Sequence, residues 1–224
     1  MIAWIIGNGK SLTLTPPEKI KKPYVSFATN LIAKRYAASL WRPTYFVAVS
    51  DAAHKPEYLP YFQEGVNFCS MGAFISGGNQ SLLYDHKGLP HTIIATYDDK
   101  PGWTDWDAEP MPKYCRWGMS HMVSFQLAAG MNPEAVYMIG FDGNFRPHEL
   151  GDDPNHFDPD YWGKFQVERP KDPEFWTRMN TDHSIAHSVI KVEFEKAGIP
   201  LYNCTPNSAF KMHEYVPFEE VING

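Results

Sequence analysis

Short apolar runs that end in glycine or a polar residue recur along the chain and predict the strands of a sheet. These runs cover residues 4–6, 24–28, 44–49, 91–96, 135–139 and 199–203. Runs of this length, rich in β-branched and aromatic side chains and bounded by Gly, Pro, Asn or Asp, are typical of strands.

Apolar positions at helical spacing lie between these runs and predict helices over residues 31–40, 120–129 and 181–197. Because strands and helices alternate, we expect an α/β fold in which crossover helices connect an open, mostly parallel sheet. The length suits one domain over residues 1–224.

Residues 144–178 are polar, rich in proline and aromatic side chains, and without a regular period. The segment is far longer than an ordinary connection, and such long segments are commonly lids or binding loops. We therefore expect a lid, with Trp162 and Phe165 exposed on it. Residues 97–115 also lack a period, and we expect a surface loop there.

Composition and charge narrow the function classes. A net charge of −6 argues against a nucleic-acid scaffold, since phosphate binding needs a basic surface. No apolar stretch approaches the length of a membrane span, about 18 to 20 residues, and the N-terminus lacks a signal-peptide pattern. Three cysteines without CxxC spacing indicate reduced thiols. We expect a cytoplasmic protein, and the sequence indicates no oligomeric state.

Polar residues follow several of the predicted strands. They are Asn8, Asn30, Asp51 and Asp142. Ligands of open parallel sheets bind at the carboxyl ends of the strands. We therefore expect these side chains to converge on a binding site.

The turn after the first strand reads Gly7-Asn8-Gly9-Lys10-Ser11. It departs from both the GxGxxG fingerprint and the P-loop. Its glycines and backbone amides would still suit close approach to a phosphate, with Lys10 or Ser11 adding a charge or a hydroxyl. We expect a nucleotide phosphate or ribose to contact residues 7–11. The alternative is a tight turn that needs a positive φ at Gly7 or Gly9.

Histidines gather in the C-terminal half, and two of them, His183 and His187, have i, i+4 spacing on a predicted helix. Without the glutamate of an HExxH motif, a zinc-protease site is not expected. A neutral imidazole suits proton transfer from a hydroxyl near neutral pH. Asp182 is expected either to orient His183 or to cap the helix. The alternative is that these histidines are core or solvated residues.

Five segments together resemble a known group of proteins. Residues 5–12, IIGNGKSL, resemble the opening I-x-G-N-G-x-S-L of the Campylobacter-type bacterial sialyltransferases and of a related group that includes the archaeal 6-hydroxymethylpterin diphosphokinase. Residues 127–130 and 136–142 are similar to the helix end and the I-x-L-x-G-x-D strand of that group. Residues 201–208, LYNCTPNS, resemble its L-Y-x-x-x-P-N-S, and residues 154–161 resemble a signature of small phage and bacterial members.

The resemblance implies a single Rossmann-like domain with a mobile lid and catalysis without a metal cofactor. It implies donor-binding roles for the strand-end residues above and for Arg116 and Ser120 as an approximate Arg-x-x-Ser motif. The two phosphate-binding tyrosines of that group would lie shortly after Asp142, where this chain has Asn144 and Leu150, and we expect Tyr161 to substitute from the lid. It also implies that His183, followed by Ser184, is the general base. His156 is our second choice of base.

These expectations lead to three functions. The first is a glycosyltransferase that moves a sugar, for example one like sialic acid, from a nucleotide-sugar donor to a glycan hydroxyl. The second is an ATP-dependent pyrophosphokinase of a pterin-like alcohol, which needs Mg²⁺ and two carboxylates. Asp142 with Asp152, Asp153 or Asp158 would supply them. The third is a nucleotide-binding module without catalysis.

Overall fold

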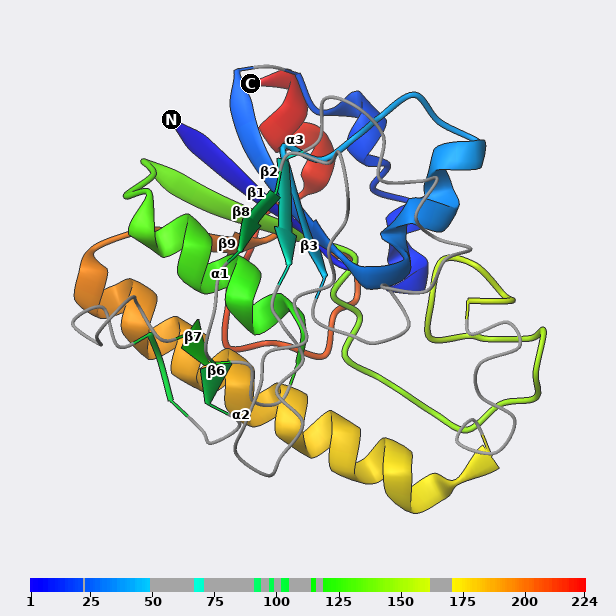
Figure 1. The fold of residues 1–224 in the computed structure, drawn as a ribbon. Helices are drawn as coiled ribbons and strands as arrows, with labels where there is room; N and C mark the ends of the chain where they lie inside the picture. The colour runs from blue at the N-terminus through cyan, green and yellow to red at the C-terminus, as the bar shows by residue number, and fades with distance from the viewer. Residues whose placement is uncertain are drawn as a thin grey trace.

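The computed structural model describes residues 1–21, 23–48, 67–70, 91–93, 97–98, 102–104, 114–115, 119–161 and 171–224. Its main sheet has the strand order β10-β9-β8-β1-β2-β3-β4-β5, and every strand pairing in it is parallel. The α/β fold with an open parallel sheet is therefore confirmed (Figure 1).

The sheet strands have the following bounds: β1 Ile2–Ile6, β2 Tyr24–Thr29, β3 Tyr45–Ala48, β4 Asn67–Ser70, β5 His91–Ile93, β8 Ala135–Ile139, β9 Leu201–Asn203 and β10 Glu214–Tyr215. A separate two-stranded sheet pairs β6 (Tyr97–Asp98) with β7 (Tyr114–Cys115). The 3-10 helices are η1 (Lys10–Thr13), η2 (Pro17–Lys19) and η3 (Asn30–Ala37), and the α-helices are α1 (His121–Gly130), α2 (Pro173–Ala197) and α3 (Phe218–Asn223).

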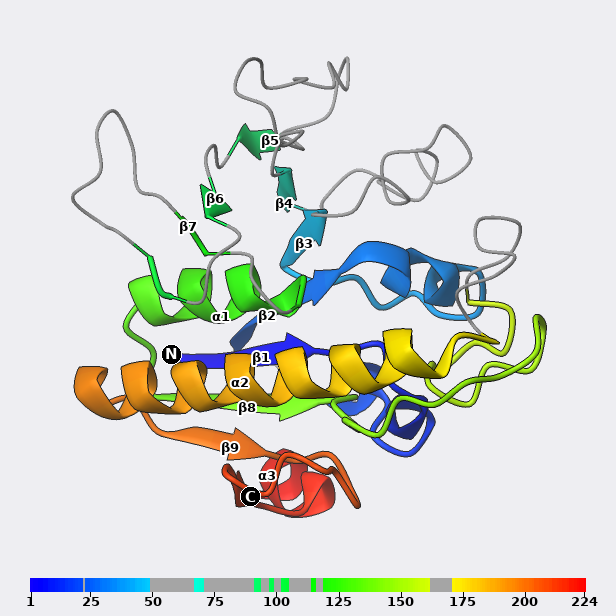
Figure 2. The ribbon, with the colours of Figure 1, turned by 90° about the horizontal axis from the view of Figure 1, so that it is seen from below.

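The two faces of the sheet are covered by different helices. Figures 1 and 2 show α1 and α2 on one face, with α3 and the 3-10 helices on the other. Alternate side chains of β1 pack into the two cores, because successive side chains of a strand point to opposite faces of the sheet. Ile5 joins the core under α1 and α2, and Ile6 joins the core under η1, η3 and α3.

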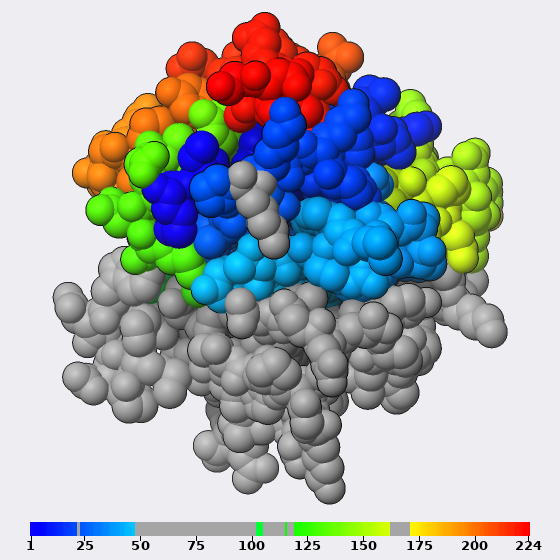
Figure 3. Space-filling model, turned by 90° about the horizontal axis from the view of Figure 1, so that it is seen from above, coloured from blue at the N-terminus to red at the C-terminus, as the bar shows by residue number. Residues whose placement is uncertain are grey.

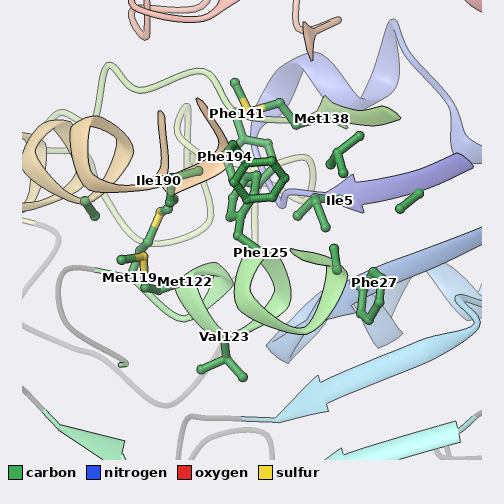
Figure 4. Packing of buried hydrophobic residues seen from close by; sticks show 14 of the residues in the cluster. Ile5, Phe27, Met119, Met122, Val123, Phe125, Met138, Phe141, Ile190 and Phe194 are labelled. Carbon is green, nitrogen blue, oxygen red and sulfur yellow. The ribbon is translucent and has the colours of Figure 1, made fainter. Parts of the chain in front are cut away.

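The core beneath α1 and α2 is built around aromatic rings. Phe125 of α1 lies against Phe141 and Phe194, with ring centroids 5.6 and 6.1 Å apart (Figure 4). On the opposite face, Trp4 packs edge-on against Phe218 of α3 at 5.9 Å. The C-terminal residues therefore lie beside the N-terminal segments (Figure 3).

Three expectations from the sequence need correction. The helix expected from residue 181 begins at Pro173, because Asp172 caps it by accepting the Glu174 N–H at 3.0 Å and proline suits a first helical turn. The helix expected over residues 31–40 is the 3-10 helix η3. The loop expected at 97–115 contains β6 and β7.

The segment after β8 is irregular from residue 144 to 161, but residues 173–178 belong to α2. The irregular stretch is therefore shorter than the expected 144–178. Trp162 and Phe165 lie outside the described residues. No helix in the described ranges is long and apolar enough to cross a membrane.

Candidate functional site

A cavity of about 270 Å³ opens at the carboxyl ends of β1, β2 and β8. The strand order reverses at β1, since β2 lies on one side of it and β8 on the other. Such a reversal is where open parallel sheets bind ligands. The cavity wall is completed by the starts of α1 and η3, the middle of α2, residues 140–145, 154–156 and 161, and Phe210.

The glycine turn after β1 is fastened to the end of β8. The Gly7 N–H donates to the Ile139 carbonyl at 2.7 Å, and the Gly9 N–H donates to the Gly140 carbonyl at 2.9 Å. Gly9 has φ −67°, and Gly7 is not among the glycines with positive φ. The expected positive φ is therefore wrong. Close backbone approach requires the glycines instead, since a Cβ at Gly7 or Gly9 would overlap the Gly140 carbonyl oxygen.

Ser11 is bonded to Asp142. Its backbone N–H and its hydroxyl both donate to the Asp142 carboxylate, the hydroxyl at 2.8 Å. Burial raises the pKa of Asp142, and the Ser11 hydrogen bonds oppose that shift. Asn8, Gly9 and Asp142 line the cavity, whereas Gly7 and Ser11 are not among its described lining residues. The N–H and the hydroxyl of Ser11 therefore both donate within the protein and are not free to bind a ligand.

Two asparagines expected at the site do reach it. Asn8 and Asn30 both line the cavity, and Asn8 Nδ2 donates to the Thr29 carbonyl at 3.2 Å. The Oδ1 atoms of both are buried and have no hydrogen-bond partner among the described residues. Ser120 lines the cavity as well. Asp51 and Arg116 lie outside the described residues.

Asp153 orients His156. His156 Nδ1 lies 2.7 Å from Asp153 Oδ2, and the imidazole stacks on Tyr161 with ring centroids 3.9 Å apart. Burial works to raise the pKa of Asp153, but the hydrogen bond and charge of His156, the Asn155 N–H and the charge of His148 together outweigh it and hold that pKa below its usual value. An ionised carboxylate only accepts, so Nδ1 carries the proton and Nε2 is the basic nitrogen. His156 and Tyr161 both line the cavity.

The chain around His156 is held by contacts to three elements. The Phe157 N–H donates to the Asn8 carbonyl at 2.9 Å, and Lys34 of η3 pairs with Asp158 at 3.1 Å. Asn180 of α2 exchanges two hydrogen bonds with the backbone of Phe145. Hydrogen bonds and an ion pair therefore hold the irregular segment in place beside the cavity.

His183 also lines the cavity, with its ring edge-on to Phe145 at 4.9 Å. It lies in the middle of α2, so the expectation that it starts the helix and that Asp182 caps it is wrong. No hydrogen bond joins it to Asp182 in the described part of the chain. Burial, followed by the charges of His121 and His156, lowers the pKa of His183 to about 3.

His187, the i, i+4 partner of His183, is absorbed into the core. Its Nδ1 lies 2.9 Å from His213 Nε2, and its ring stacks on Phe210 at 3.8 Å. It is not among the described lining residues of the cavity. Within the described ranges, no group of three or more His, Cys, Asp or Glu residues is arranged to hold a metal ion.

His121, the first residue of α1, is a cavity residue that the sequence reasoning missed. Its Nε2 lies 3.1 Å from the Ile6 carbonyl oxygen and 2.8 Å from Thr29 Oγ1. Burial lowers its pKa to about 4. The available signal was a histidine next to Ser120, at the start of an otherwise apolar helix.

The C-terminal TPNS segment supports the end of β8. Thr205 Oγ1 accepts the Phe141 N–H at 3.1 Å, and the Ser208 hydroxyl donates to the Phe141 carbonyl at 2.6 Å. The Ala209 N–H donates to the Asp142 carbonyl at 2.7 Å. These bonds hold the backbone of Phe141 and Asp142 in place, so the segment has a structural role.

Buried histidines predict loss of stability in acid. Burial lowers the pKa of His121 and His213 to about 4, that of His183 to about 3 and that of His187 well below 6.5. Below pH 6.5 the unfolded chain therefore binds more protons than the folded one, so the free energy of unfolding falls as pH falls. Each such histidine contributes up to about 1.4 kcal/mol per pH unit, less where it is partly exposed. Asp142, whose pKa is raised, acts in the opposite direction.

Urea unfolding between about pH 7.5 and 4.5 measures this slope. His187→Phe keeps an aromatic ring in the aromatic pocket and removes one titrating group, so it should make the slope shallower. A free energy of unfolding that stays constant from neutral pH to about pH 4.5 would contradict the prediction.

Comparison with known proteins gives no match, whether to a protein-family model, to a curated protein or to a solved structure.

Proposed function

We propose that this protein is a glycosyltransferase with a Rossmann-like domain that moves a sugar from a nucleotide-sugar donor to a glycan hydroxyl. The segment 144–161 would serve as a lid-like wall over the donor. The strand reversal at β1 and the cavity beside it support a nucleotide site. The resemblance of the turn and strand motifs supports a nucleotide sugar as the ligand.

One observation carries the proposal: the Asp153–His156 hydrogen bond of 2.7 Å beside the cavity. A histidine held in one tautomer by a carboxylate is suited to act as a general base. His156 Nε2 would take the proton of the acceptor hydroxyl. The acceptor oxygen would form the new bond to the anomeric carbon while the bond from that carbon to the donor phosphate oxygen breaks. The nucleotide would leave with the bonding electrons.

Between the two candidate bases, the geometry favours His156. His183 has no described hydrogen-bond partner to fix its tautomer, and its pKa of about 3 makes it a weak base. Its edge-on contact with Phe145 supports a role in shaping the cavity.

The pyrophosphokinase alternative gains no specific support from the carboxylates. Asp142 accepts two hydrogen bonds from Ser11, Asp153 pairs with His156, and Asp158 pairs with Lys34. Each of these carboxylates already has a partner within the chain.

The test is a ligand screen followed by a turnover assay. CMP-, UDP- and GDP-sugars and ATP, each with and without Mg²⁺, are added in thermal unfolding experiments. A nucleotide sugar at a hundred times its Kd should add about 2.7 kcal/mol to the free energy of unfolding. The stabilising donor should then release free nucleotide in the presence of a glycan acceptor and EDTA. Stabilisation by ATP with Mg²⁺ alone would favour the kinase, and binding without turnover would favour a non-catalytic module.

A further inference from the structure

Three residues that line the cavity, Asn8, Asn30 and Asp142, carry hydrogen-bond acceptors. Asn8 Oδ1 and Asn30 Oδ1 are buried without a partner among the described residues, and Asp142 lines the same cavity. Leaving a buried acceptor unpaired costs about 1–3 kcal/mol. A ligand group that donates hydrogen bonds to this wall would recover part of that cost.

His121 adds a further acceptor. Its Nε2 lies 3.1 Å from the Ile6 carbonyl oxygen, which can only accept, and 2.8 Å from Thr29 Oγ1, which can accept as well, so both contacts are compatible with a ring proton on Nε2. In the neutral ring, Nδ1 then holds a lone pair. No hydrogen bond to Nδ1 is made within the described residues. The carbonyl at the end of β1 thus favours the tautomer in which His121 can accept a hydrogen bond from a ligand.

The same wall is a poor place for a phosphate. The Gly9 N–H is bonded to the Gly140 carbonyl, and the N–H and hydroxyl of Ser11 are bonded to Asp142. No Lys or Arg of the described residues lines the cavity, and the Asp142 carboxylate carries negative charge when ionised. A phosphate here would face acceptors and a carboxylate without donors to offset them.

We infer that His121, with Asn8 and Asn30, binds an uncharged, hydroxyl-bearing part of the ligand. The phosphates of the ligand then bind away from these three residues. The hydroxyls belong either to the ribose or to the transferred sugar, since both present the same donors. The inference rests on the proposed function and deepens it by making His121 a specificity-determining residue.

Two variants separate the nitrogens of His121. His121→Gln places its amide near the position of Nε2, so it can keep the donor to the Ile6 carbonyl but loses the acceptor at Nδ1. His121→Asn places its amide near the position of Nδ1, so it can keep an acceptor there and loses the bond to Ile6. Melting temperatures of both variants check that they fold.

Binding is measured by NMR titration with cytidine, uridine, 2′-deoxycytidine, galactose and inorganic pyrophosphate. At least one nucleoside or galactose should bind, and His121→Gln should weaken its affinity about tenfold, the loss of one hydrogen bond of about 1.4 kcal/mol. His121→Asn should stay within about threefold of the wild type. Weaker binding of 2′-deoxycytidine than of cytidine assigns the hydroxyl to the ribose, and binding of galactose assigns it to the transferred sugar.

The ¹⁵N shift of His121 Nδ1 in the wild-type protein gives a readout that needs no variant, and the bound nucleoside or sugar should move it. Pyrophosphate moving that shift, equal affinities of the wild type and His121→Gln, or no binding by any probe would overturn the inference. Nucleotide-sugar turnover is assayed separately. Turnover without any effect of His121→Gln refutes this inference alone, and His121-dependent binding without turnover refutes the glycosyltransferase alone.

Discussion

Replacing His156 with asparagine should slow sugar transfer about a hundredfold to ten-thousandfold, the usual loss when a general base is removed. Donor affinity should remain nearly unchanged, because a general base acts on the acceptor hydroxyl. Asp153→Asn should also slow transfer, since an amide can donate as well as accept and no longer fixes the Nδ1–H tautomer of His156. Single-turnover rates and calorimetric donor affinities measure the two effects separately.

His183→Asn is the matched control, because His183 lines the same cavity without a carboxylate partner in the described part of the chain. It should change turnover far less than His156→Asn. Melting temperatures of the variants are needed as well, since His156 stacks on Tyr161 and its loss also removes packing. Near-normal turnover in His156→Asn together with a collapse in His183→Asn would transfer the role of base to α2.

The strand ends were predictable because the parallel sheet places them by a simple rule. The apolar runs that became β1, β2 and β8 are each followed by a polar residue, and all three strands point the same way. Asn8, Asn30 and Asp142 therefore meet at one cavity. For these residues, local sequence pattern and fold direction were sufficient.

The partners of these residues were not predictable, because they depend on contacts between distant segments. Ser11 and Asp142 are separated by 131 positions, and their bond follows from the pairing of β1 with β8. The role of His121 depends on the Ile6 carbonyl, 115 positions away. Neither pair shares a motif or spacing that a single sequence reveals.

The start of α2 was missed for a local reason. Asp172 and Pro173 are a recognisable N-cap and first helical residue, but they lie within a proline-rich stretch that also fits a loop. The apolar spacing of the helix becomes clear only further along, where Ala186, Ile190 and Phe194 enter the core. The local cap at Asp172 sets where the helix begins, but the sequence pattern around it does not distinguish a helix start from a loop.

Replacing Gly9 with alanine should destabilise the protein by about 3 kcal/mol, the upper end of the usual cost of overpacking. The backbone of Gly9, at φ −67° and ψ 161°, suits any residue, so strain in φ does not contribute. The added Cβ would lie 2.6 Å from the Gly140 carbonyl oxygen and would overlap the Asp142 carboxylate. Asp142 would have to move away from Ser11, which donates two hydrogen bonds to it.

Gly151→Ala is the control. It has a positive φ but no atom within 4 Å of the added Cβ, so it should cost only about 1 kcal/mol. Urea unfolding at neutral pH compares the two variants, and a Gly9→Ala protein that is as stable as Gly151→Ala would show that the turn and the end of β8 are not packed this closely.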